Sequence, residues 1–163
     1  MILEQANVCI GSESHSLLPA SLKYARAWAG IADAYVLIGL SGALTGGLPP
    51  HDIYPEAKQA ASTAIELHEA LADAHTALGF IKFFYDWDPR GAQEELNRAL
   101  ALHPHYPSAH HGQALTNGFL GRYNEAVNWI ERALEIEPLS LILNPNKGYC
   151  FILGATMKTL SPS

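Results

Sequence analysis

The stretch FFYDWDPRGA, residues 83–92, sets two aspartates among aromatic side chains, a proline and a glycine. Paired carboxylates serve general acid and base catalysis, so Asp86 and Asp88 raise the question of an active site. However, no nucleophile or basic residue has a fixed position beside them. Asp88 followed by Pro89 is instead a typical helix start. We therefore predict a junction between two helices, with Phe80, Phe83, Phe84 and Trp87 forming the core stripe of the first.

Histidines raise the question of a metal site, above all in HPHYPSAHH, residues 103–111. Zinc needs three or four converging ligands, whereas the neighbouring His110 and His111 point to different faces of one helix. His75 and His110 share a register one repeat apart, which favours packing or hydrogen bonding between helices. The sequence therefore predicts no metal site, no cofactor and no enzyme activity.

A glycine-rich segment, GLSGALTGGLPPHD at residues 39–52, is the one candidate for a phosphate loop. It lacks the lysine and hydroxyl residue that follow the last glycine of a P-loop, and a helix rather than a strand precedes it. We expect a flexible excursion between two helices, with Pro55 and Glu56 restarting the chain as helix.

Composition narrows the class of partner. The chain has 163 residues, of which 48% are hydrophobic and 16% are charged, with a formal net charge of -6. Nucleic acid is disfavoured because its phosphates require clustered Lys and Arg. The first residues lack a basic region, and no apolar run approaches the ~18 residues of a membrane span, so we expect a cytoplasmic protein. Cys9 and Cys150, far apart in the sequence, are expected to be free thiols.

Small residues recur at a nearly constant step. Alanines separated by 35 and then 34 residues occur in two series: Ala57, Ala92 and Ala126, and Ala64, Ala99 and Ala133. The segments that precede them share a register with a small residue at Ala32, Gly79, Ala114 and Gly148. Such a period predicts an all-α stack of helix, turn, helix units in which small residues let the helices approach closely. We expect almost no sheet.

The residues Trp28, Ile31, Ala32 and Tyr35, the segment LGRYNEA, and Pro138 resemble the tetratricopeptide repeat. The resemblance implies an α-α superhelix of stacked antiparallel helix pairs, with about three full repeats and a terminal helix. We expect a degenerate remnant at 1–22, a repeat domain at 23–154 and a tail at 155–163. The repeats span about 25–69, 72–104 and 107–138, and the terminal helix spans 141–154.

The resemblance also implies the function. Such stacks bind a peptide or protein segment on the concave face that their first helices line. By register, the binding residues expected here are Arg26, Asp33, Asp73, Thr76, Phe80, Phe83, His111 and Leu115. Phe80 and Phe83 fit either the core stripe or this groove, and the sequence leaves both alternatives open. Some family members grip a carboxylate with Lys, Asn and Arg, but this chain has Ala29, Asp33, Ser108 and Gly112 at those places. An apolar or basic segment is therefore the expected partner.

A narrower resemblance concerns YARAWAGIADAY, FIKFFYDWD and PLSLILN. Together they look like the repeat regions attached to bacterial winged-helix regulators, serine/threonine kinases and adenylate cyclases. This implies an alternative function as the regulatory fragment of a larger bacterial signalling protein. The apolar terminal helix has no second helix to cover it, which favours homodimerisation or a continuation of the chain over a bare monomer.

Overall fold

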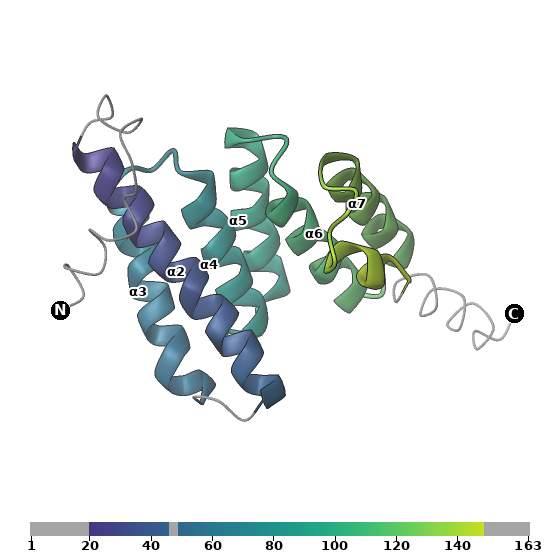
Figure 1. The fold of residues 1–163 in the computed structure, drawn as a ribbon, viewed down its shortest axis with the longest axis horizontal. Coiled ribbons are helices and arrows are strands. Elements are labelled where there is room, and N and C mark those ends of the chain that lie inside the picture. The colour runs from purple at the N-terminus through teal and green to yellow at the C-terminus, as the bar shows by residue number, and fades with distance from the viewer. Residues whose placement is uncertain (1–19, 46–48, 149–163) are drawn as a thin grey trace, which may run out of the picture.

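The computed structural model describes residues 20–45 and 49–148, and every regular element in these ranges is a helix. The helices are α2 (Ala20–Thr45), α3 (Pro50–Leu67), α4 (Ala72–Phe84), α5 (Pro89–Leu102), α6 (Pro107–Phe119) and α7 (Tyr123–Ile136). They pack as the antiparallel pairs α2–α3, α4–α5 and α6–α7, and the pairs stack one after another (Figure 1). The predicted all-α stack of helix pairs is confirmed.

The small residues lie where the helices meet. All six alanines of the two repeating series, together with Ala32 and Ala114, are fully buried. The side chain of Leu96 on α5 fits between two glycines of neighbouring first helices. A Cβ on Gly79 would lie 2.9 Å from the Leu96 Cγ, and one on Gly112 would lie 2.6 Å from its Cδ2. The role predicted for the small residues, close approach of helices, is therefore confirmed.

The glycine- and proline-rich insert differs from its prediction. Residues 41–45 continue α2, and α3 already begins at Pro50, so Pro55 lies inside the helix instead of at its start. The longer helices are favoured because Ile53 and Tyr54 are buried against them. The Tyr54 ring packs against Gly39, where an added Cβ would lie 2.9 Å from the ring carbons. The same ring stacks on Tyr85. This burial outweighs the local preference of glycine and proline for loops.

The junction at residues 85–88 is confirmed as a turn between two helices. Asp88 is the N-cap of α5, and its carboxylate accepts a 2.9 Å hydrogen bond from the Gly91 amide. The predicted core stripe is wrong at Trp87, which lies beyond the end of α4 and is 72% exposed. Trp87 has a left-handed backbone with φ of 54°, so it does not continue the helical spacing that predicted a core position.

Histidines make hydrogen bonds within the stack, as predicted for His75 and His110. His75 Nδ1 lies 2.8 Å from the Glu95 carboxylate on α5, and its Nε2 lies 3.0 Å from the Glu69 carbonyl. His110 Nε2 donates to the Pro104 carbonyl at 2.8 Å. These bonds tie first helices to second helices and to the preceding turns.

Helix continues at residues 143–148, beyond α7. Leu143 is buried, and Asn146 bonds back to α6, so this segment packs on the stack. The remaining part of the predicted terminal helix, residues 149–154, lies outside the described residues, as do the predicted tail and residues 1–19. Self-association through the terminal helix therefore stays a prediction.

Two glycine substitutions test the close packing. Gly112→Val would press against Leu96 and should lower the free energy of unfolding by about 1–3 kcal/mol. Gly30 lies in α2 with no neighbouring atom within 4 Å of a Cβ, so Gly30→Ala should stabilise the protein by about 0.5–1 kcal/mol. Urea unfolding measures both values. Equal effects of the two substitutions would contradict the proposed contact.

Candidate functional site

The predicted binding residues come from α2, α4 and α6, the first helices of the three pairs. Helix α2 contacts α4, and α4 contacts α6. We call the surface that these three helices share the first-helix face. Side chains that are half-buried there are Asp33, Asp73, Phe80, Phe83, His111 and Leu115. Arg26 is exposed, whereas Thr76 is only 1% exposed and is therefore not available for a partner.

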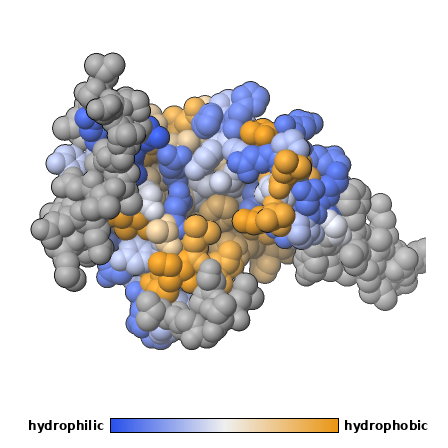
Figure 2. Space-filling model, viewed as in Figure 1, coloured by the Kyte–Doolittle hydropathy of each residue, from blue (hydrophilic) through white to orange (hydrophobic). Residues whose placement is uncertain are grey.

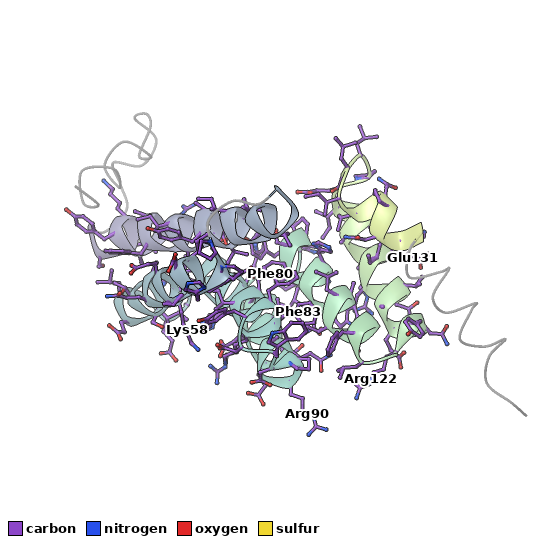
Figure 3. All side chains as sticks on the ribbon, turned by 90° about the horizontal axis from the view of Figure 1, so that it is seen from below. Lys58, Phe80, Phe83, Arg90, Arg122 and Glu131 are labelled. Atoms are coloured by element: carbon purple, nitrogen blue, oxygen red, sulfur yellow. The ribbon has the colours of Figure 1, made fainter. Side chains whose placement is uncertain are left out.

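Aromatic side chains form a continuous series of contacts across this face. Phe80 contacts His111 of α6 at 6.2 Å between ring centroids, and it stacks on Phe84 at 6.1 Å. Phe84 meets Phe83 at 5.0 Å in an edge-to-face arrangement. Figure 3 shows Phe80 and Phe83 near the centre of the stack, whereas Arg90 and Arg122 extend outward. These contacts join α4 to α6.

The series ends in two exposed rings. Phe83 meets Phe119 edge-to-face at 5.6 Å, and Phe119 contacts Trp87 at 6.2 Å. Phe119 is 57% exposed and Trp87 is 72% exposed. We call the six residues His111, Phe80, Phe84, Phe83, Phe119 and Trp87 the aromatic run. Its exposed end is a large apolar surface of the kind that anchors protein partners.

Sequence reasoning missed both exposed rings. Phe119 follows Phe84 by one repeat step of 35 residues, so its register predicts the core position that was expected of Phe84. Trp87 was also placed in the core, because a helix continued past Phe84 would bury it. Figure 2 shows further apolar residues from the middle of the molecule to the lower end of α2, where Leu37, Ile38 and Leu40 are exposed.

Two half-buried aspartates come from the packed helices α2 and α4 at the other end of the first-helix face. Burial, and then the negative charge of Asp73 on α4, raise the pKa of Asp33 on α2 to about 7. Tyr106 lies just before α6, and burial together with the charges of the two aspartates raises its pKa, so its hydroxyl stays neutral and can donate to them. We call Asp33 and Asp73 the carboxylate pair.

No cation balances the carboxylate pair within the described part of the chain. Ion pairs there involve other acidic residues, and no basic group contributes to the pKa of Asp33. The nearest basic side chain along α2, Arg26, is exposed, and no ion pair among the described residues joins it to either aspartate. The face therefore presents negative charge beside aromatic surface.

His111 is a neutral member of the aromatic run. Burial lowers the pKa of His111 to about 4, so the imidazole is uncharged at physiological pH. Its Nε2 lies 2.8 Å from the Asn146 side-chain amide, which donates to the neutral ring. Among residues 20–45 and 49–148, no three histidine, cysteine or acidic side chains converge as metal ligands.

Comparisons with known proteins identify the fold. No family model matches the sequence, and no curated protein is significantly similar to it. A thermophilic TPR protein of Thermus thermophilus has a TM-score of 0.63 and 20% identity over 79% of this chain. The first TPR domain of human RPAP3 has a TM-score of 0.61 and 19% identity, covering 80% of this chain and 98% of that domain. The chain has the tetratricopeptide-repeat (TPR) fold.

A third TPR structure contains a ligand. The first TPR of Spaghetti (RPAP3), bound to the HSP90 peptide SRMEEVD, has a TM-score of 0.58 and 20% identity, covering 78% of this chain and 95% of that one. Our chain spans 64% of the length of the Thermus thermophilus protein. In the described parts of this TPR stack, no helix has the length and apolar character needed to cross a membrane.

The protonation of Asp33 predicts how stability depends on pH. Its pKa is about 7 in the folded state and 3.8 when unperturbed, so between these values the folded protein holds a proton that the unfolded chain has released. The free energy of unfolding should therefore fall as the pH rises from about 4 to 7.

Replacing the Asp33 carboxylate with an uncharged amide should remove this loss of stability at high pH. Asp33→Asn should stabilise the protein by about 2 kcal/mol at pH 8 and change little at pH 4, as measured by urea unfolding at both pH values. Glu66→Gln, at an exposed position on α3, is the matched control and should have little effect at either pH. A loss of stability in Asp33→Asn at pH 8 would contradict the assignment.

Proposed function

We propose that this chain is a non-catalytic protein-interaction module that binds a peptide or protein segment on its first-helix face. The observation that carries the proposal is the aromatic run, which ends in the exposed rings of Phe119 and Trp87. Exposed aromatic side chains in contact with one another are typical anchors of protein interfaces, because they bury a large area at low entropic cost.

The strained backbone of Trp87 supports the proposal that a partner binds at this surface. Trp87 is the one residue other than glycine with positive φ in the described ranges, and this conformation carries a cost of about 1 kcal/mol or more. Such costs are concentrated at functional sites. The left-handed turn holds the indole against Phe119 instead of burying it. A partner that packs on both rings would bury the apolar area that folding leaves exposed.

The TPR fold is consistent with this function, since one solved relative holds the HSP90 peptide SRMEEVD. An acidic peptide is a poor candidate here. Asp33 and Asp73 make the face negative, Ala29 is buried, and Gly112 packs directly on Leu96. Of the residues predicted from sequence, we retain Asp33, Asp73, Phe80, Phe83, His111, Leu115 and Arg26 as the binding surface, and we add Phe119 and Trp87.

The setting of this function is proposed from the sequence. The resemblance to repeat regions attached to bacterial winged-helix regulators, kinases and cyclases suggests a cytoplasmic signalling role, in which the module is a regulatory part of a larger protein. Such a role uses the same binding surface.

Selection from a displayed library of random peptides tests the proposal. Selected peptides should bind the wild-type protein, and the double substitution Trp87→Ala and Phe119→Ala should weaken them by about tenfold or more, since each ring contributes of the order of 1 kcal/mol. Both side chains are exposed, so the circular dichroism spectrum should be retained.

A second solvent-facing position supplies the control. Leu102 on α5 is 44% exposed and lies on a second helix, so Leu102→Ala should leave affinity within about twofold. Trp87 is the most exposed of the three tryptophans, so tryptophan emission should also shift to the blue when a partner covers it. Peptides that bind equally well to the double variant would overturn the proposed surface.

A further inference from the structure

We propose that the segment bound by the first-helix face carries a lysine or arginine beside apolar side chains, with the carboxylate pair receiving the cation and the aromatic run receiving the apolar groups. This inference rests on the proposed function and adds the chemistry of the partner. Its basis is charge complementarity on a surface that the protein itself leaves unbalanced.

Elsewhere in the fold, a buried carboxylate receives cations. Glu95 on α5 accepts from Lys82 Nζ at 2.9 Å and lies 2.8 Å from His75, with Arg98 at 3.5 Å. Burial alone would raise the pKa of Glu95, but the hydrogen bonds from Lys82 and His75 hold it below its usual value. A structural carboxylate in this protein is thus fully compensated.

The carboxylate pair lacks this compensation. Asp33 on α2 and Asp73 on α4 are both half-buried on helices that pack together, and neither takes part in an ion pair among the described residues. Two carboxylates on neighbouring helices repel each other and lower stability when both are ionised. A cationic side chain from a partner would relieve that repulsion in a partly desolvated place, where an ion pair is stronger than on an open surface.

The two parts of the site are continuous along α4. Asp73 and Phe80 are seven residues apart, which corresponds to two helical turns or about 10 Å.

Charged and titratable groups around the pair do not oppose a cation. Asp33 comes from α2, Asp73 from α4 and Tyr106 from the turn before α6. His111 on α6 is neutral above about pH 4 because burial lowers its pKa. Arg26 is exposed on α2.

Three end-blocked amphipathic peptides test the inference. They share the same leucine positions and differ in the residue at every polar position. This residue is lysine in the first peptide, glutamate in the second and glutamine in the third. At pH 8 and physiological salt, we expect the lysine peptide to bind about tenfold more tightly than the other two, as measured by fluorescence polarisation. Asp33→Asn and Asp73→Asn should each weaken the lysine peptide about fivefold or more and leave the glutamine peptide unchanged.

Two controls exclude a general effect of charge. Glu66→Gln removes the same charge from the exposed side of α3 and should leave the affinity for the lysine peptide within about twofold. Wild-type affinity for the lysine peptide should rise between pH 6 and pH 8 as Asp33 ionises, whereas Asp33→Asn should show no such rise. A lysine preference that persists unchanged in both aspartate variants would overturn the inference.

The outcomes separate this inference from the proposed function. If all three peptides bind equally and Trp87→Ala with Phe119→Ala weakens them all, the proposed function stands and the cation preference is wrong. If neither the aromatic nor the aspartate variants change any affinity, both are wrong. If light scattering shows a dimer that the aromatic double variant dissociates, the occupant is a second copy of this chain, and the inference is also wrong.

Discussion

Close contact between helices at alanine and glycine positions is the constraint on which the rest of this structure depends. The alanines repeat at steps of 35 and 34 residues, and each is fully buried. Leu96 fills the space above Gly79 and Gly112, which links successive pairs. The phenylalanines of α4 are half-buried, and Phe80 and Phe84 pack against this core, so the aromatic run is supported by the same stack.

The treatment of buried charge separates the structural part of the protein from its candidate site. Glu95 lies between the helices of one pair with histidine, lysine and arginine around it. Asp33 lies on the first-helix face with another aspartate as its neighbour. One arrangement stabilises the fold, whereas the other reduces its stability at neutral pH. Residues that lower stability without a structural benefit are typical of binding sites.

Much of the fold could be predicted from the sequence, because a repeat period and a row of small residues report directly on helix pairing. The same register placed Asp33, Asp73, Phe80 and Phe83 on one face. The insert after Ser41 could not be predicted in this way, since its glycines and prolines favour a loop locally, whereas the burial of Ile53 and Tyr54 is a tertiary effect.

Two side chains show why the site was only partly predictable. Trp87 matches the helical spacing of a core residue, and its exposure depends on a left-handed backbone that spacing does not reveal. Thr76 has the register of a binding residue but is covered by its neighbours. For Thr76 the position along the helix was right and only its depth was not predicted, whereas for Trp87 the helix ends before the residue.

Mapping of the bound peptide on the protein by amide chemical shifts is the most direct test of the central claim, that the first-helix face is the binding surface. Titration of the isotope-labelled protein with the lysine peptide should shift amides of α2, α4 and α6, with the largest changes near Asp33, Phe80 and Phe119. Shifts confined to α3, α5 and α7 would place the partner on the opposite side of the stack and contradict the account.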